Sequence, residues 1–215
     1  MNMSQDNHEQ LWNEYFYPDT NVLKNNLNIQ DEEELREKEA TMSFERLLEL
    51  QEKPIQLGCG KEHLKAIHQY IFQDLYPFAG QYRKVNILKE KGTFFYMTEG
   101  KTIDGALDEL FQEIEQNMMK CFGKNEFCEL LGKLYTRLIY IHPFREGNGR
   151  SIREFLREFT MEKSKELGLG ELELDWSKIN KDELNQYIEV AHLYPGATGL
   201  LFKDALVEKA KEKKF

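Results

Sequence analysis

The segment from residue 142 to residue 150 constrains the fold of this chain more than any other stretch. It reads His-Pro-Phe-Arg-Glu-Gly-Asn-Gly-Arg. Pro143 has no backbone N–H and cannot continue a helix from the residues before it, so the apolar run over residues 131–141 must end there. A second helix-like run covers residues 150–165, with apolar side chains spaced along one face. The sequence therefore predicts two helices joined by a short loop.

This loop carries groups that bind an anion. Gly147, Asn148 and Gly149 open the second helix, and a helix start presents free N–H groups and a partial positive charge. Glycines also let the backbone approach a phosphate closely. Arg150 and Arg153 lie on one side of the first turn, and both can fork onto phosphate oxygens. Together these features predict a phosphate-binding site.

Two further side chains add chemistry to that site. His142 can take up or release a proton near neutral pH, which suits a general base acting on a hydroxyl. Glu146 offers hard oxygen ligands for Mg²⁺ held between the protein and phosphates. The combination favours phosphoryl or nucleotidyl transfer over a plain turn in which glycine and asparagine only cap the helix. The sequence contains neither a P-loop nor a His-Glu-x-x-His zinc motif.

Composition limits the partners and the compartment. The 215 residues carry a net charge of −9, which disfavours non-specific binding to nucleic acid. No apolar stretch is long enough to span a membrane, and the polar N-terminus has no secretory signal. The three cysteines, Cys59, Cys121 and Cys128, lack metal-ligand spacing and fit a reducing environment. We expect a cytoplasmic protein without a membrane partner, with signal-independent secretion left open.

Hydrophobic periodicity and turn residues predict a mainly α protein with one hairpin. Residues 1–14 are expected to be flexible, and residues 15–215 to form a single domain. Two short β-like runs, residues 85–88 and 93–97, flank a Lys-Glu-Lys-Gly turn and predict the hairpin. The expected helices cover residues 22–27, 31–50, 61–75, 102–121, 127–141, 150–165 and 180–193, and residues 199–213 are expected to close the domain.

Three stretches of the chain resemble the Fic-domain family. Residues 142–150 fit every defined position of its signature, His-Pro-Phe-x-Asp/Glu-Gly-Asn-Gly-Arg. Residues 76–87 resemble the family's turn into a β-hairpin called the flap, and residues 17–25 resemble the N-terminal part of short toxin-type and effector-type members. The resemblance covers about residues 15–205. It implies the Fic fold, a helical bundle with one short β-hairpin flap.

The resemblance also implies an activity, the transfer of AMP from ATP, with Mg²⁺, to a Ser, Thr or Tyr hydroxyl of a target protein. His142 matches the family's general base, Glu146 matches its Mg²⁺ ligand, and Phe144 matches a buried anchor of the loop. The residues matched to nucleotide binding are Gly147, Asn148 and Gly149 in the anion hole, Arg150 at a phosphate, and Arg153 at the γ-phosphate.

The flap would clamp an extended segment of the target protein by strand addition. The alternative is a structural hairpin packed on the helices, and the placement of the hairpin favours the flap. The residues expected to bind the target are Val85, Asn86, Ile87, Leu88, Thr93, Phe94 and Phe95.

Gly149 bears on the reaction. The death-on-curing branch of the family carries lysine at this position and works as a kinase with the nucleotide reversed, whereas glycine leaves room for the AMP-transferring orientation. Another nucleotide donor, removal of AMP, and a non-catalytic nucleotide-binding module are the alternatives. His142 argues against the last of these, because a binding module would tolerate its loss.

Inhibition in this family commonly involves a helix with the pattern Ser/Thr-x-x-x-Glu-Gly/Asn, whose glutamate pairs with the second arginine. A carboxylate on Arg153 would take that charge away from the γ-phosphate. No window of this chain satisfies the pattern; the nearest, residues 41–46, ends in Arg46 and is interpreted as an ordinary helix segment. We therefore expect the inhibitory helix to come from a small antitoxin-like partner, as in toxin-type members.

Overall fold

The structure is a computed structural model that describes residues 5–88, 94–95, 102–191, 194 and 196–209. The chain forms two compact units. The N-terminal unit comprises residues up to 106 together with residues 141–151, and the C-terminal unit comprises residues 107–140 and 152 onwards. The single domain over residues 15–215 stays a prediction.

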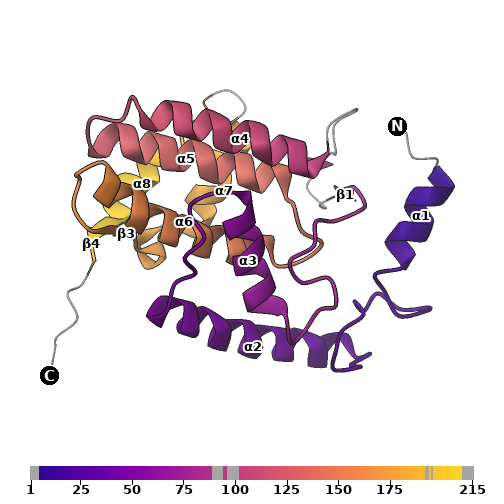
Figure 1. Cartoon of the computed structure of the whole chain (residues 1–215). Coiled ribbons are helices and arrows are strands. Elements are labelled where there is room, and N and C mark those ends of the chain that lie inside the picture. Colours follow the sequence, from indigo (N-terminus) through magenta and orange to yellow (C-terminus); the bar gives the residue numbers. More distant parts are fainter. Residues whose placement is uncertain (1–4, 89–93, 96–101, 192–193, 195, 210–215) are drawn as a thin grey trace, which may run out of the picture. The chain divides into compact units, whose positions relative to one another are not determined.

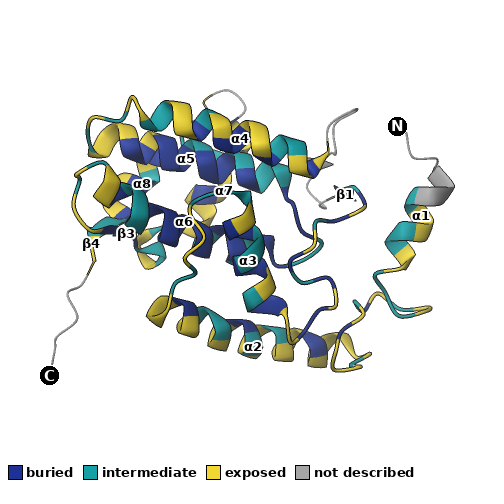
Figure 2. Ribbon diagram, in the orientation of Figure 1, coloured by how far each residue is buried: buried dark blue, intermediate teal, exposed yellow. Residues whose placement is uncertain are grey.

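Helices α2 and α3 form the framework of the N-terminal unit. Helix α2 covers Glu32–Glu52 and helix α3 covers Lys61–Phe72, and the two pack against each other (Figure 1). The N-cap Asp31 accepts a hydrogen bond from the Glu34 N–H, and three glutamates follow in the first turn. Both features stabilise a helix start. Helix α3 buries half of its residues, whereas α2 exposes a long face (Figure 2).

The segment before α2 differs from the prediction. The short helix expected around residues 22–27 is wrong, because these residues form a loop that includes a β-bridge between Phe16 and Leu23. The buried side chain of Asn25 holds this loop by accepting from the Ile29 N–H (3.0 Å) and donating to the Ile29 carbonyl (2.7 Å). Asparagine often replaces regular backbone pairing in this way. Residues Gln5–Asn13, expected to be flexible, form helix α1.

The predicted hairpin is present but short. Strands β1 (Ile87–Leu88) and β2 (Phe94–Phe95) pair antiparallel, with Ile87 opposite Phe95 and Leu88 opposite Phe94. Val85 and Asn86 precede β1 rather than belonging to it. Thr93, the predicted turn at residues 89–92 and the end of the second run lie outside the described residues. A mainly helical fold with a small antiparallel hairpin is therefore confirmed.

Helices α4 to α8 dominate the C-terminal unit. Most of α4 and α5 lies here, together with α6 after its first turn, and α5 is buried on most sides, as its apolar sequence predicted. The helices are α4 (Ile103–Met118), α5 (Lys124–Ile141), α6 (Asn148–Glu166), α7 (Lys181–Val190) and α8 (Gly199–Ala205), with a single 3₁₀ turn at Trp176–Lys178. Among the described residues, none of the helices combines the length and apolar character needed to cross a bilayer.

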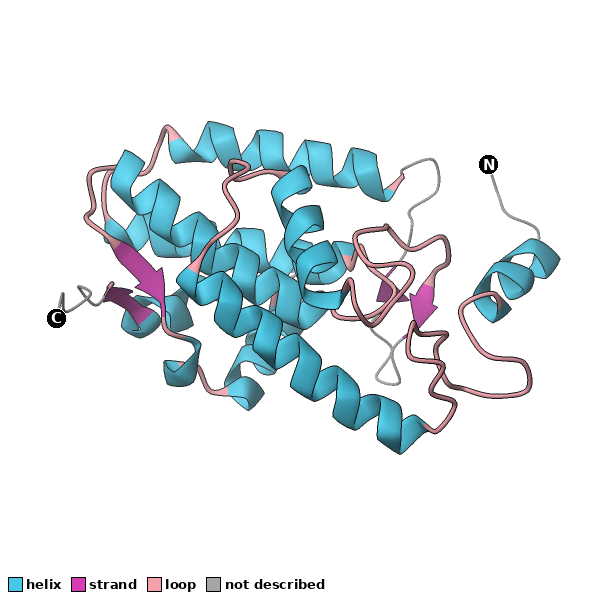
Figure 3. Ribbon diagram, turned by 60° about the horizontal axis from the view of Figure 1, so that its bottom comes forward, coloured by secondary structure: helices cyan, strands magenta, loops and turns pink. Residues whose placement is uncertain are grey.

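A second sheet in the C-terminal unit was not predicted. Strand β3 (Leu172–Leu174) pairs antiparallel with β4 (Leu206–Glu208), the two magenta arrows near the C-terminus in Figure 3. The segment from residue 199, expected to close the domain, begins with α8, which ends at Ala205, and continues directly as β4. Three-residue strands are too short to show the alternation by which a strand is recognised, so only the pairing of distant segments reveals this sheet.

Two glycines set the distance between α5 and α8. A Cβ on Gly132 would lie 2.2 Å from the Gly199 nitrogen, and a Cβ on Gly199 would lie 2.5 Å from the Cys128 carbonyl oxygen. The buried Thr198 hydroxyl donates to the Gly132 carbonyl (2.7 Å) and pairs with the Thr136 hydroxyl (3.0 Å). Backbone therefore meets backbone at this contact, and no side chain can move aside.

We expect Gly132→Ala to destabilise the protein by about 1–3 kcal/mol, because an added methyl group must push the two helices apart. For a chain of this length, that corresponds to a fall in melting temperature of roughly 2–4 °C per kcal/mol in a thermal unfolding scan. The matched control is Gly60→Ala, since nothing lies within 4 Å of a Cβ at Gly60. Equal melting temperatures for the two variants would contradict the packing argument.

Candidate active site

The backbone of His142 adopts a conformation that few residues other than glycine adopt. Helix α5 ends at Ile141, and His142 follows with φ of 47° and a buried side chain. A positive φ at a non-glycine residue costs free energy and persists only where neighbouring groups hold it. Such residues are concentrated at functional sites. The structure thus draws attention to the same histidine as the sequence did.

Arg83 holds this turn in place. Its Nε donates to the His142 carbonyl (2.7 Å), its Nη2 donates to the Ile141 carbonyl (3.1 Å), and its backbone N–H donates to the Pro143 carbonyl (2.9 Å). A third guanidinium bond, from Nη1, reaches the Val85 carbonyl just before β1. Burial lowers the pKa of Arg83 to about 10, which leaves the guanidinium charged at neutral pH. Arg83 therefore fixes the three successive carbonyls of residues 141–143 and joins them to the base of the hairpin.

Asn148 closes the loop on itself. Its Oδ1 accepts from the Phe144 N–H (2.9 Å) and its Nδ2 donates to the Phe144 carbonyl (2.8 Å). Both residues are buried, and Phe144 is fully so, as expected for an anchor. Because the side-chain amide is engaged inward, the groups at the start of α6 that remain to meet an anion are the backbone N–H groups of its first turn.

Gly147 is required by the packing beneath the loop. It has φ of 79°, and a Cβ there would lie 2.2 Å from Cε2 of the Phe72 ring. Its N–H donates to Glu146 Oε1 (2.8 Å), and its carbonyl accepts from the Ser151 N–H at the start of α6. Sequence analysis assigned Gly147 to phosphate binding. The structure adds that a side chain at this position would clash with Phe72.

His68 of α3 supports the loop from below, a role that the sequence analysis missed. Its Nδ1 accepts from the Gly80 N–H (2.9 Å), so its Nε2 carries the proton and donates to the Glu146 carbonyl (3.0 Å). The imidazole also stacks on the Phe144 ring, with centroids 3.8 Å apart. Burial lowers the pKa of His68 to about 4, so the ring is neutral at physiological pH.

The carboxylate of Glu146 is placed to bind a cation. Its side chain is 43% exposed, Oε1 accepts from the Gly147 N–H, and Arg150 Nη2 lies 3.9 Å from Oε1. Within the described part of the chain, Oε2 makes no hydrogen bond or ion pair, and no cluster of three or more metal-ligating side chains exists. One open carboxylate fits Mg²⁺, which usually binds one or two carboxylates together with substrate phosphates and water.

Arg150 and Arg153 occupy successive turns of α6. Arg150 points towards α2 and α3, where it forms an ion pair with Glu39 and donates to the Ser43 hydroxyl (2.9 Å). Arg153 lies in the C-terminal unit, where its carbonyl accepts from Trp176 Nε1 (3.2 Å). The contacts of both arginines with a nucleotide stay predictions.

Arg145, the variable position of the motif, fixes the loop to the N-terminal segment. Its guanidinium carbon lies 4.5 Å from the centroid of Trp12, 5.6 Å from that of Tyr15 and 5.1 Å from that of Phe16. Cation–π contacts of this kind are favourable, particularly when desolvated. Sequence analysis gave Arg145 no role, because its aromatic partners lie about 130 residues earlier.

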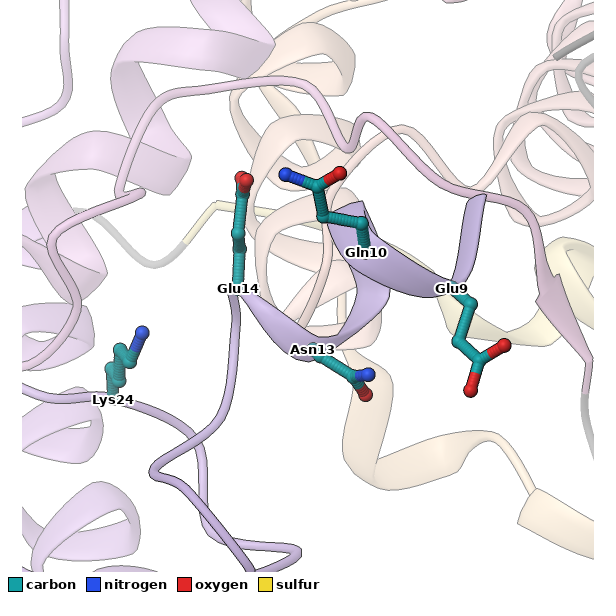
Figure 4. Close-up of a pocket in the computed structure, with 5 residues that line it drawn as sticks. All are labelled: Glu9, Gln10, Asn13, Glu14 and Lys24. Atoms are coloured by element: carbon teal, nitrogen blue, oxygen red, sulfur yellow. The ribbon is translucent and has the colours of Figure 1, made fainter. Parts of the chain in front are cut away.

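An open depression lies beside α1 in the N-terminal unit. It has a volume of about 570 Å³ and is lined by Glu9, Gln10, Asn13, Glu14 and Lys24, none of which belongs to the motif (Figure 4). These side chains are exposed and mix both signs of charge with amides. The depression therefore lacks the apolar walls typical of a small-molecule site.

Comparisons with known proteins agree with this geometry. The model of the Fic/DOC family matches residues 59–160. The protein named "Probable protein adenylyltransferase y4lH" of Sinorhizobium fredii is 34% identical over 160 residues, which cover 73% of this chain and 80% of that protein. Protein adenylyltransferase VbhT of Bartonella schoenbuchensis is 30% identical over 173 residues, 80% of this chain but 34% of VbhT, so the chain spans about a third of that relative.

Solved structures extend the likeness to the fold. The crystal structure of BepC from Bartonella tribocorum, with bound AMPPNP, superposes with a TM-score of 0.71. The two chains are 25% identical, and the match covers 92% of this chain and 98% of that one. The chain thus falls in a class of mainly helical proteins that carry a short hairpin and a His-Pro-Phe loop before a helix. The chain belongs to the Fic/DOC family.

The burial of His68 predicts how stability depends on pH. Its pKa is about 4 when folded and about 6.5 when unfolded, so the unfolded chain binds the proton more tightly. The His68 contribution is fully present above pH 6.5 and is lost as pH falls from there towards 4. Relative to His68→Gln, the wild type should lose about 2 kcal/mol between pH 8 and pH 5.

Urea unfolding of both proteins at several pH values measures this difference. Glutamine keeps a donor for the Glu146 carbonyl but does not titrate, so it is the suitable comparison. Parallel stability curves for the two proteins over this pH range would show that His68 does not remain neutral in the folded state.

Proposed function

We propose that this chain is a protein adenylyltransferase that transfers AMP from ATP to a Ser, Thr or Tyr hydroxyl of a target protein. The observation that carries the proposal is His142, which is buried, has a positive φ and is held by Arg83. It begins the loop that leads from α5 into the Gly-Asn-Gly start of α6. The names of the curated relatives and the AMPPNP bound to BepC support the choice of reaction and nucleotide.

His142 would act as the general base. The imidazole takes the proton of the target hydroxyl while the hydroxyl oxygen attacks the α-phosphorus of ATP. A bond forms between that oxygen and the α-phosphorus, the bond from the α-phosphorus to the bridging oxygen breaks, and pyrophosphate leaves. Fixing the backbone at His142 through Arg83 restricts where the ring can reach, which is how a positioned base gains efficiency.

The phosphates would lie at the start of α6. Backbone N–H groups of Gly147, Asn148 and Gly149 and the partial charge of the helix would receive the α- and β-phosphates, and Arg150 and Arg153 would add positive charge. Glu146 would hold Mg²⁺, which would supply positive charge to the phosphates. Gly149 has no side chain to crowd the phosphates, which favours AMP transfer over phosphorylation.

The target protein would bind at the hairpin. Residues 85–88 with Phe94 and Phe95 supply strand edges to which an extended target segment can add. The Arg83 bond to the Val85 carbonyl would keep the modified hydroxyl in register with His142, because one side chain joins the two segments. A role of Thr93 belongs to the same proposal.

Regulation in trans and a cytoplasmic location complete the proposal. Glu45, the glutamate of the nearest inhibitory-like window, is exposed and makes no ion pair within the described residues, while Arg46 pairs with Glu49 and Asp74. The window therefore has no inhibitory contact of its own there, and a small antitoxin-like partner would supply the missing glutamate-bearing helix.

His142→Ala should abolish AMP transfer, lowering it by more than about 100-fold, because the hydroxyl loses its base. The measurement is labelling of lysate proteins with α-³²P-ATP and Mg²⁺, with binding of AMPPNP as the control for an intact nucleotide site. Label from γ-³²P-ATP alone would indicate a kinase orientation. Equal labelling by wild type and variant would remove His142 from the mechanism.

A partner that inhibits in trans should act through Arg153. We expect the product of a small neighbouring open reading frame, when co-purified, to suppress labelling by the wild-type protein, since its glutamate would compete with the γ-phosphate. Arg153→Ala should weaken that suppression, and the lone protein should be active. A lone protein that stays inert with every lysate tested would remove the support for a missing inhibitor.

A further inference from the structure

Arg150 lies in a pocket built by α2 and the end of α3. The Arg150 pocket consists of Glu39, Ser43, Phe72 and Tyr76. Glu39 and Ser43 are one turn apart on α2 and accept from the two terminal nitrogens of the guanidinium, with 2.9 Å between Nη1 and the Ser43 hydroxyl. The Phe72 ring lies beneath the guanidinium, with its centroid 4.8 Å away. A carboxylate, a hydroxyl and an aromatic ring thus hold the guanidinium, and 23% of the Arg150 side chain stays exposed.

Glu39 is itself fixed from the other side. Its Oε2 accepts a hydrogen bond from the Tyr76 hydroxyl, while Oε1 pairs with Arg150. Burial, together with the charge of Glu39, raises the pKa of Tyr76 far above its ordinary value, so this hydroxyl remains a donor. The side chains of Glu39 and Arg150 are only 17% and 23% exposed, so the ion pair is less screened than a surface pair.

A second carboxylate competes for the same guanidinium. Arg150 Nη2, the atom that pairs with Glu39, lies 3.9 Å from Oε1 of Glu146, which stands four residues earlier in the loop before α6. Arginine forms short, bidentate pairs with whichever carboxylate is available. With Glu39 present, the closer pair is to Glu39, and Oε2 of Glu146 keeps no partner among the residues described. Without that charge, Glu146 would be the nearest anion.

We propose that Glu39 is a positioning residue that holds Arg150 away from Glu146 and so keeps the Glu146 carboxylate available for Mg²⁺. This inference rests on the proposed function, since it concerns the same nucleotide and metal site. Glu39 touches neither the reacting atoms nor the metal and acts only through Arg150. The pairing differs from inhibition at Arg153, because it involves the first arginine and favours the active arrangement.

The inference predicts a selective change in Mg²⁺-dependent nucleotide binding. We expect Glu39→Gln to leave the Kd for AMPPNP in EDTA little changed. The improvement of that Kd on adding Mg²⁺ should fall by about tenfold, as for other residues that orient a metal ligand. Isothermal titration calorimetry with AMPPNP, with EDTA or Mg²⁺, measures both values without requiring a target protein. A merely structural role would weaken both affinities together.

The matched control is Glu37→Gln, which removes the same charge from an exposed position of α2 and should leave both affinities unchanged. Should Glu39→Gln fail to fold, Tyr76→Phe removes the other support of Glu39 and should lower the Mg²⁺ effect in the same direction, by less. A Mg²⁺ effect equal to that of the wild type in both variants overturns the inference alone. A wild-type protein whose AMPPNP affinity ignores Mg²⁺ overturns the proposed metal site as well.

Discussion

The hydrogen bonds from Arg83 to the carbonyls around His142 are the interaction on which the site depends. A helix ends at Ile141 and the next residue has a positive φ, a conformation that is unfavourable unless neighbours hold it. Arg83 holds this conformation by donating hydrogen bonds from its buried side chain and from its backbone N–H. Because the same guanidinium bonds the Val85 carbonyl, the position of the hairpin base and that of the histidine are set together.

Some residues of the motif pack the loop, whereas other groups stay available to a ligand. Asn148 and Phe144 turn inward and close the loop, Gly147 fits against Phe72, and Arg145 packs among aromatic rings. What remains at the start of α6 is its backbone N–H groups and the partly exposed Glu146 carboxylate. Several residues of the motif are therefore explained by the folding of the loop itself, and not by chemistry alone.

Helices α2 and α3 act as the support of this loop. His68 reaches the Glu146 carbonyl, Phe72 lies under both Gly147 and Arg150, and Glu39 pairs with Arg150. The acidic sequence of α2 suggested a solvated face, which holds for its exposed glutamates. Glu39 departs from that description, because Tyr76, in the turn after α3, and Arg150, in the first turn of α6, bind it in the same unit.

The sequence by itself determined the local features of this protein. Proline and glycine placed the end of α5 and the start of α6, and apolar periodicity predicted the long helices. The pattern of residues 142–150 indicated the family and the candidate site. Each of these depends on neighbours within a few residues along the chain. The hairpin followed in the same way, and its described strands β1 and β2 pair antiparallel as predicted.

Only the tertiary structure decided the features that depend on distant partners. Arg83 bonds carbonyls about 60 residues away, His68 reaches a carbonyl 78 residues away, and Glu39 meets an arginine 111 residues away. The β3–β4 sheet was missed because each strand is three residues long, and the loop at residues 22–27 because Asn25 replaces helical pairing. Side-chain periodicity reports which face is buried, but not which distant group that face will meet.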